Sequence, residues 1–170
     1  INPLQFNFKV VDNISPILKK IKFYCFDTTL INGYNSSKIY NIIKHNNNYT
    51  ISEIPNIKGD FAIGIYTYDQ AEGAYNKNGI YSVKVRSNGV EKFFYKMDRM
   101  NFDDSKYINL LIDYEELTRK RKRIQLFTLH PEQKLSFIKD NSLQGIIKID
   151  EEKSYQILIE LKDYNQNTSY

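Results

Sequence analysis

Cysteine and tryptophan are nearly absent from this 170-residue sequence, which has one cysteine and no tryptophan. A disulfide within the chain is therefore excluded. Cys25 alternates with Ile21 and Phe23, so we expect it in the core, where an unpaired cysteine packs as a small hydrophobic residue. No apolar run is long enough for a transmembrane segment, and no signal peptide is visible. Ile1 is not an initiator methionine, so we expect the chain to be a fragment.

Sequence motifs of catalytic sites are missing as well. There is no G-x-S-x-G turn, no glycine-rich phosphate loop and no arrangement of cysteine and histidine typical of a nucleophile. Neither His45 nor His130 lies at metal-ligand spacing from other ligands. We therefore predict no catalytic residue, no bound cofactor and no metal site in this chain.

Four aspartates that are close in sequence leave one cation site open. Carboxylate oxygens are ligands that calcium prefers, but the spacing matches no EF-hand loop, and Arg99 and Lys106 offset the negative charge. The sequence does not decide whether a cation binds there. The four residues are Asp98, Asp103, Asp104 and Asp113.

The composition is that of an ordered, β-rich globular protein. Tyrosine and phenylalanine are abundant, with 14 and 10 residues, and both favour strands. The formal net charge of +4 is modest for this length. It neither requires nor excludes an anionic partner such as nucleic acid or a cell-wall polymer.

The region 59–86 carries the clearest strand pattern. Inward and outward positions alternate over 61–67, and again over 81–86 after a polar loop, which is the period of a half-buried strand. Asn88-Gly89 tolerates the positive φ angles of a tight hairpin, so we predict that a third strand, 92–97, pairs with the second. The three strands together predict an antiparallel meander within one sheet of a small β-sandwich.

Further short strands are expected at hairpin spacing, and the fold class that fits them is all-β. Segment 38–44 is undecided between a helical turn and a strand. Segment 107–114 is apolar enough to be a strand buried on both faces or a connecting segment. The other expected strands are 6–10, 21–25, 49–54, 124–129, 134–138, 143–149 and 155–161.

A weak internal repeat relates three of these strands, which end in Asp12, Asp69 and Asp163. An aspartate that closes a strand can accept hydrogen bonds from backbone N–H groups of the following loop. Strands also end in aspartate by chance, as Asp27 shows. The repeat predicts two consecutive immunoglobulin-like antiparallel β-sandwich units. We expect a connecting strand and linker over residues 1–15, a first unit over 16–100 and a second over 101–170.

Two surfaces are candidates for a ligand or partner. Five consecutive basic residues beginning at Arg119 invite a nucleic-acid interpretation. We favour a solvated loop whose cations partly pair with the two preceding glutamates, because no aromatic platform or helical face accompanies the run, and we expect no nucleic acid as partner. The residues of this surface are Arg119, Arg121 and Arg123. The second surface is an aromatic platform of Tyr66, Tyr68 and Tyr75, although outward tyrosines are ordinary on a sheet.

Short motifs also occur in a fixed order along the chain. They are Asn2-Pro3-Leu4-Gln5-Phe6, Asp12-Asn13-Ile14-Ser15-Pro16, Asn78-Gly79-Ile80-Tyr81, Met97-Asp98-Arg99-Met100-Asn101-Phe102, Tyr107-Ile108-Asn109, Asp113-Tyr114 and Asp163-Tyr164-Asn165-Gln166-Asn167-Thr168-Ser169. Together they resemble the C-terminal region of lysostaphin-type zinc metalloendopeptidases, in the variant whose envelope peptidase domain is followed by a long β-rich extension. The resemblance covers nearly the whole chain.

The resemblance implies that this chain lies downstream of a catalytic domain. That domain ends in a His-x-His motif shortly before an Asn-Pro-Leu sequence, so Ile1 would begin just past the active site. Zinc would be held there by two histidines and an aspartate, none of which has a counterpart here. We then expect a non-catalytic accessory region that positions or regulates a peptidase acting on peptidoglycan cross-links, or docks it to envelope partners. Its place would be the cell envelope, periplasmic or associated with the outer membrane.

Two other functions stay open from the sequence. A scaffolding or interaction module of an outer-membrane or secretion assembly would need only sheet edges and loops for its contacts. A stand-alone carbohydrate-binding sandwich would need the exposed tyrosine platform.

Overall fold

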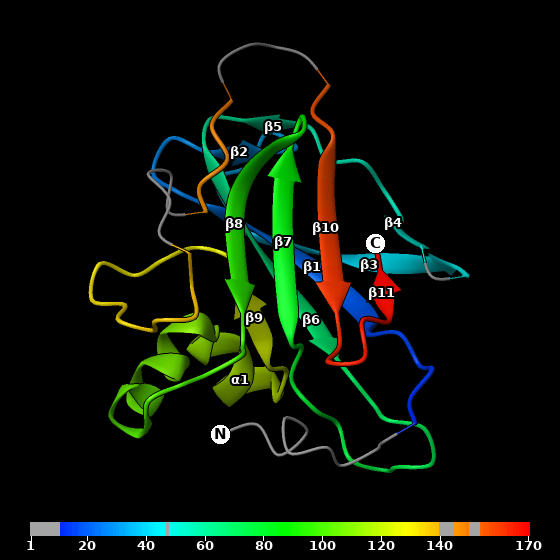
Figure 1. The fold of residues 1–170 in the computed structure, drawn as a ribbon. Coiled ribbons are helices and arrows are strands. Elements are labelled where there is room, and N and C mark those ends of the chain that lie inside the picture. The colour runs from blue at the N-terminus through cyan, green and yellow to red at the C-terminus, as the bar shows by residue number, and fades with distance from the viewer. Residues whose placement is uncertain (1–10, 47, 140–144, 150–153) are drawn as a thin grey trace.

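The computed structural model describes residues 11–46, 48–139, 145–149 and 154–170. Strands make up most of its regular secondary structure, which confirms the predicted all-β class (Figure 1). The strands are β1 (Ile17–Cys25), β2 (Leu30–Ile31), β3 (Lys38–His45), β4 (Asn48–Ile51), β5 (Ile57–Lys58), β6 (Phe61–Tyr68), β7 (Ser82–Ser87), β8 (Val90–Lys96), β9 (Ile124–Leu126), β10 (Ile157–Lys162) and β11 (Thr168–Ser169). The helices are a 3₁₀ helix (Phe102–Leu111) and α1 (Tyr114–Lys120). Neither of these two helices is long and apolar enough to cross a membrane.

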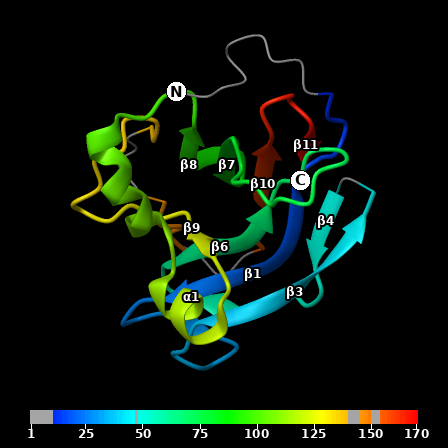
Figure 2. The same ribbon diagram turned by 90° about the horizontal axis from the view of Figure 1, so that it is seen from below.

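The strands form three antiparallel sheets. One has five strands in the order β4-β3-β1-β6-β9, one has four in the order β11-β10-β7-β8, and β2 pairs with β5. Figure 1 shows the four-stranded sheet in front of the five-stranded sheet, and the view from below in Figure 2 shows the same two layers edge-on. The arrangement is a β-sandwich.

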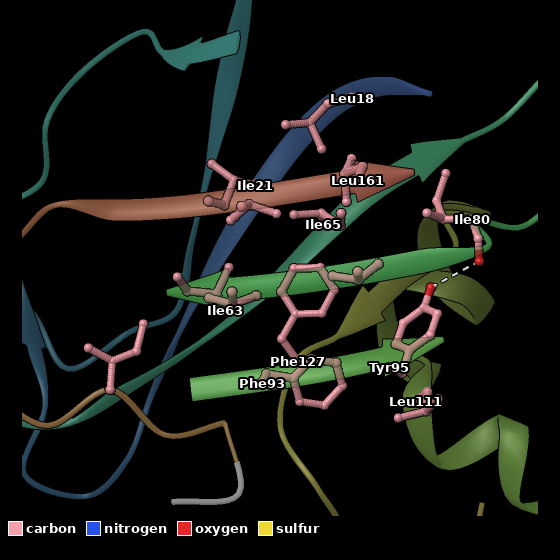
Figure 3. Packing of buried hydrophobic residues seen from close by; sticks show 14 of the residues in the cluster. Leu18, Ile21, Ile63, Ile65, Ile80, Phe93, Tyr95, Leu111, Phe127 and Leu161 are labelled. Atoms are coloured by element: carbon pink, nitrogen blue, oxygen red, sulfur yellow. Dashed lines mark hydrogen bonds between the residues drawn. The ribbon is translucent and has the colours of Figure 1, made fainter. Parts of the chain in front are cut away.

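The core fills the space between the two large sheets (Figure 3). Phe127, which follows β9, packs its ring 5.5 Å from that of Phe93 on β8, measured between centroids. Tyr95 is fully buried, and its hydroxyl donates a hydrogen bond of 3.2 Å to the carbonyl of Ile80, so that no polar group is left unpaired by its burial. The fully or almost fully buried side chains that the sheets contribute include Phe23, Ile63, Ile65, Val83, Val85, Phe93, Tyr95 and Leu161.

The hairpin of β7 and β8 confirms the prediction made from Asn88-Gly89. Both turn residues have positive φ, 47° for Asn88 and 81° for Gly89, as a tight hairpin turn requires. The predicted meander is wrong, however, because β6 pairs with β1 and β9, whereas β7 pairs with β8 and β10. The polar loop between β6 and β7 therefore crosses from one sheet to the other.

The structure decides two segments that the sequence left open and corrects a third. Segment 38–44 is the strand β3, and 134–138 is not a strand, since only Ile138 forms an isolated bridge. Segment 107–114 is a connecting segment rather than a strand, because the 3₁₀ helix ends at Leu111 and a helix cap follows. The expected strand 6–10 lies outside the described residues, as does part of 143–149.

Strand pairing also crosses the boundary that the sequence predicts near residue 100. β10 pairs with β7 over six residues, and this register places Ile159 beside Val85 and Leu161 beside Val83. Side chains from both predicted units belong to one hydrophobic cluster. The described residues thus form a single sandwich with a shared core, which the prediction of two consecutive units did not anticipate.

Residues 16–100 expressed alone are expected not to unfold cooperatively. The truncation removes β10 from the edge of β7, and it removes Phe127, Ile159 and Leu161 from the core. Thermal unfolding followed by circular dichroism, with the full chain as reference, measures this. A sharp transition of the fragment at the melting temperature of the full chain would contradict the shared core.

Candidate functional site: a polar groove above a buried ion network

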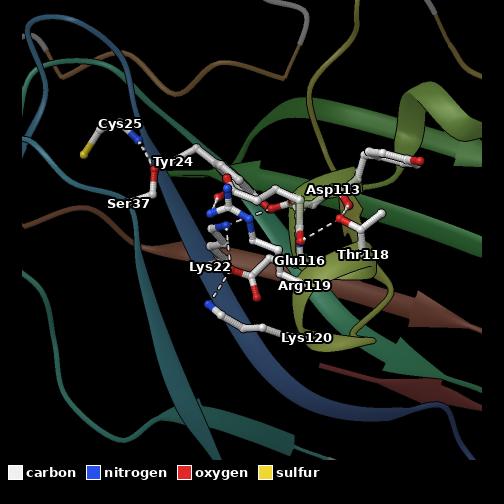
Figure 4. A network of polar contacts seen from close by, with 11 residues as sticks. Lys22, Tyr24, Cys25, Ser37, Asp113, Glu116, Thr118, Arg119 and Lys120 are labelled. Carbon is white, nitrogen blue, oxygen red and sulfur yellow. Dashed lines mark hydrogen bonds and ion pairs between the residues drawn. The ribbon is translucent and has the colours of Figure 1, made fainter.

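The candidate site is built around Lys22, a lysine on the central strand of the five-stranded sheet. β1 lies between β3 and β6, so both of its edges are hydrogen-bonded. Ile21 and Phe23 face the core, and Lys22 lies on the opposite face, which α1 covers (Figure 4). Only 7% of Lys22 is exposed. A charge buried to this extent requires charged or hydrogen-bonding partners.

Two buried carboxylates supply those partners. Lys22 Nζ lies 2.8 Å from Asp113 Oδ2 and 3.1 Å from Glu116 Oε1. Asp113 is 8% exposed and Glu116 4%. Tyr24 donates its hydroxyl to Asp113 Oδ2 at 2.6 Å, and Lys120 Nζ lies 2.9 Å from Glu116 Oε1. Two cations thus face two anions, and we call these five residues the Lys22 network.

Helix α1 exists because its first residues are capped from within this network. Asp113 is the N-cap, and its Oδ1 accepts a hydrogen bond of 3.0 Å from the backbone N–H of Glu116. The helix ends at Lys120, and its C-cap Arg121 has a left-handed φ of 51°. The sequence prediction of a solvated loop is therefore wrong for Arg119 and Lys120, which belong to α1, whereas residues 121–123 lie outside any helix or strand. Its prediction of pairing is confirmed, since Arg119 lies 2.7 Å from Glu115 and Lys120 pairs with Glu116.

The pKa values of four residues of the network, Lys22, Tyr24, Asp113 and Glu116, move away from neutrality. Burial alone would lower the pKa of Lys22, but its hydrogen bonds to Asp113 and Glu116 outweigh this effect and raise it. Burial would raise the pKa of both carboxyls, yet the bonds from Lys22 and Tyr24 lower that of Asp113, and those from Lys120 and Lys22 lower that of Glu116. Burial raises the pKa of Tyr24, and its bond to Asp113 adds to the rise. Each group therefore keeps one protonation state near neutral pH, which suits a structural role rather than proton transfer.

A groove of about 680 Å³ opens above this network. One wall is β3, the other is α1, and the connection after β4 contributes the rim. The lining is mostly polar and carries both signs of charge. The lining residues are Lys22, Asn32, Ser37, Lys38, Ile39, Tyr40, Asn41, Ser52, Glu53, Glu115, Glu116 and Lys120.

Charged groups at different depths define the chemistry of the groove. Glu53 on the rim is exposed and forms no ion pair with a described residue. Lys38 places its Nζ 5.1 Å from the ring centroid of Tyr34. Burial, and then the charge of Glu53, raises the pKa of Tyr40. Deeper in, Glu116 Oε2 is buried and accepts no hydrogen bond from the part of the chain that the structure describes.

The structure does not gather the residues of the predicted surfaces into this groove. Tyr66 and Tyr68 are half-buried on β6, and Tyr75 is 98% exposed in the loop that follows. Two lysines lie over the ring of Tyr68, Lys19 at 5.9 Å and Lys77 at 4.4 Å from its centroid. The three basic residues Arg119, Arg121 and Arg123 are exposed at the end of α1, outside the groove lining.

The four aspartates considered as ligands of a cation do not form one site in the structure. Asp113 belongs to the Lys22 network, and Asp98 lies 2.9 Å from Lys96 Nζ and accepts a hydrogen bond from Tyr81. Among the described residues they form no common group of metal-ligand atoms. Cys25 is half-buried against the core, and burial raises the pKa of its thiol, so it is a poor nucleophile.

Reasoning from sequence missed Lys22, and it named Asp113 only as a possible cation ligand and Glu116 only as a partner of the basic run. A lysine between two hydrophobic residues of a strand is ordinarily an outward, solvated residue. The available signal was the spacing Asp113 to Glu116, an N-cap followed three residues later by glutamate, which predicts a helix start. That helix would have put both carboxylates on one element.

Replacing Lys22 with methionine is expected to lower the free energy of unfolding by about 3 kcal/mol at pH 7, because Asp113 and Glu116 lose their buried partner. The pKa values of these carboxyls are lower in the folded chain than the values of about 4 in the unfolded chain, so the two carboxylates stabilise the fold at a pH above about 4. This stabilisation is lost as the pH falls through their pKa values in the folded chain. The cost of Lys22→Met should therefore shrink toward pH 3.

Urea denaturation at both pH values measures this cost. Lys19→Met, on the same strand but exposed, is the matched control and should change stability by less than about 0.5 kcal/mol. An equal cost of Lys22→Met at pH 7 and pH 3 would contradict the role given to the two carboxylates.

Comparison with known proteins identifies no relative. No family model matches the sequence, and no match is found among the curated proteins or the solved structures. The resemblance to lysostaphin-type peptidases therefore rests on the short motifs alone and stays a prediction. The function has to be argued from the groove and its charges.

Proposed function

We propose that this chain is a non-catalytic binding module that holds a polar ligand carrying both ammonium and carboxylate groups. The observation that supports this proposal is the groove between β3 and α1, in which charges of both signs surround a buried, paired ion network. An apolar ligand would take water away from Lys38 and Glu53, the lining charges that form no ion pair with a described residue, which is costly. A purely anionic or purely cationic ligand would meet repulsion from half of them.

The groove is preorganised for such a ligand. Its α1 wall is tied to β1 through the ion pairs of Lys22 with Asp113 and Glu116. Its β3 wall is paired with β1 over Phe23 to Lys20. Since both walls are attached to the same strand, binding would order few groups, and little of the interaction free energy would be lost to conformational entropy.

Peptides with free amino and carboxyl groups are the ligand class that fits this charge pattern. The resemblance to the extension of lysostaphin-type enzymes points to the stem and cross-link peptides of peptidoglycan within that class. In this proposal the chain belongs to the cell envelope and docks a preceding peptidase domain to the wall. Zinc and the catalytic residues belong to that domain.

The tyrosine surface supports a carbohydrate platform less well. Lys19 and Lys77 already lie over the ring of Tyr68. No ring contact joins Tyr66, Tyr68 and Tyr75 among the described aromatic residues. A sugar ring would therefore have to displace a lysine to stack on Tyr68.

Isothermal titration calorimetry of the chain with a soluble, cross-linked muropeptide tests this proposal. We expect saturable binding, which Glu53→Gln weakens by roughly fivefold because it removes one charge-assisted hydrogen bond from the rim. Glu132→Gln is the matched control, since Glu132 is exposed and lies outside the groove lining. Its affinity should equal that of the unchanged chain.

Other outcomes separate the competing functions. If the chain binds peptide-free glycan strands and Tyr75→Ala abolishes that binding, the chain is a carbohydrate-binding sandwich instead. Absence of binding to either ligand, together with co-purification of a protein partner from envelope extracts, would replace the proposal with a scaffolding module.

A further inference from the structure

Three aspartates from distant parts of the sequence meet at one end of the sandwich. Asp12 precedes β1, Asp69 follows β6 and Asp163 follows β10. One carboxylate oxygen from each lies within 4.8 Å of the others. Figures 1 and 2 show the segment before β1, the end of β6 and the connection from β10 to β11 at this same end. We call these residues the aspartate cluster.

Two of the three aspartates of the cluster are buried, Asp12 is half-buried, and their charge is not balanced. Asp69 is 8% exposed and Asp163 only 1%. None of the three forms an ion pair with a lysine or arginine of the described residues. Asp69 Oδ1 is buried and accepts no hydrogen bond from them. A buried oxygen of this kind is rare in folded proteins and calls for an explanation such as an ion.

Hydrogen bonds hold the other two carboxylates in place. Asp163 accepts from the backbone N–H of Asn167 at 2.8 Å and from its side-chain Nδ2 at 2.7 Å. The same Nδ2 donates to the backbone carbonyl of Asp12 at 2.8 Å. Asp12 Oδ1 accepts from the backbone N–H of Ile14 at 3.0 Å. These contacts fix the positions of the carboxylates without neutralising them.

The ionisation of the cluster reflects this uncompensated charge. Burial raises the pKa of Asp69 to about 6, and the charges of Asp163 and Asp12 add to the rise. Burial also raises the pKa of Asp163, against the opposing effect of its bonds to Asn167. A bound cation would reverse these effects, because it would favour the ionised carboxylates.

We propose that the aspartate cluster binds one divalent cation, with calcium preferred. All candidate ligand atoms are oxygens, which are the ligands that calcium favours. Zinc and copper are also bound by nitrogen and sulfur ligands. Oxygens bound to one calcium ion lie at most about 5 Å apart, and the three carboxylates are already within that spread. Calcium takes roughly six to eight oxygens, so water molecules would complete its coordination.

Such an ion would connect parts of the fold that no covalent bond joins. Asp69 belongs to the end of the five-stranded sheet and Asp163 to the end of the four-stranded sheet. Asp12 belongs to the segment that enters β1. One cation would thus fix both sheets and the entering segment to each other. This inference does not depend on the ligand of the groove.

The test measures calcium binding to the full chain by isothermal calorimetry and by thermal unfolding. We expect the melting temperature of the unchanged chain to rise with millimolar CaCl₂. Asp69→Asn should weaken calcium binding at least tenfold and abolish that rise. Without calcium it should be as stable as the unchanged chain or more so, because a buried charge is removed.

Asp27→Asn is the matched control, because Asp27 also follows a strand but is exposed and lies outside the cluster. It should bind calcium like the unchanged chain. Should Asp69→Asn fail to fold, Asp12→Asn serves instead, since an asparagine oxygen can still accept from Ile14. No calcium binding at millimolar concentration, tighter binding of magnesium, or equal loss in Asp27→Asn would overturn the proposal.

Discussion

The charge of Lys22 is the constraint on which the candidate site depends. A lysine on the central strand β1, with only 7% of its surface exposed, is stable only if anions accompany it. Asp113 and Glu116 do so, and their side chains attach α1 to the outer face of the sheet. This buried cation, together with the backbone hydrogen bond from Asp113 N–H to the carbonyl of Ile124, holds α1 and with it one wall of the groove in position.

The other large-scale constraint is the shared core of the two sheets. β6 and β7 are neighbours in sequence but belong to different sheets, and β10 returns from the end of the chain to pair with β7. Both sheets therefore contain strands from distant parts of the sequence. Their inner faces are closed by Phe93, Phe127 and Tyr95, whose rings pack against one another or against neighbouring side chains. Stability in such a fold depends on long-range contacts.

Local structure was predictable from sequence wherever short-range physics decides it. The hairpin at Asn88-Gly89 follows from the φ angles that the turn requires. The turns after Asp12 and Asp163 follow from the capacity of aspartate to accept backbone hydrogen bonds. A period of two identifies a strand but says nothing about which strand will pair with it, so the meander of β6, β7 and β8 was wrong.

The functional residues were less predictable because they depend on tertiary contacts. Nothing in the neighbourhood of Lys22 in the sequence shows that a helix about 90 residues away will cover it. The repeat of strand-ending aspartates was visible, and it named Asp12, Asp69 and Asp163. That their carboxylates converge follows only from the way the sandwich brings the strand ends together.

We propose that the groove between β3 and α1 is the binding surface of this chain. The most direct measurement is the mapping of backbone amide chemical shifts by NMR while a soluble cell-wall peptide is added. We expect the shifts to concentrate on residues 37–41, 52, 53, 115, 116 and 120, which line the groove. Shifts concentrated around Tyr66, Tyr68 and Tyr75, or no shifts at saturating peptide, would contradict it.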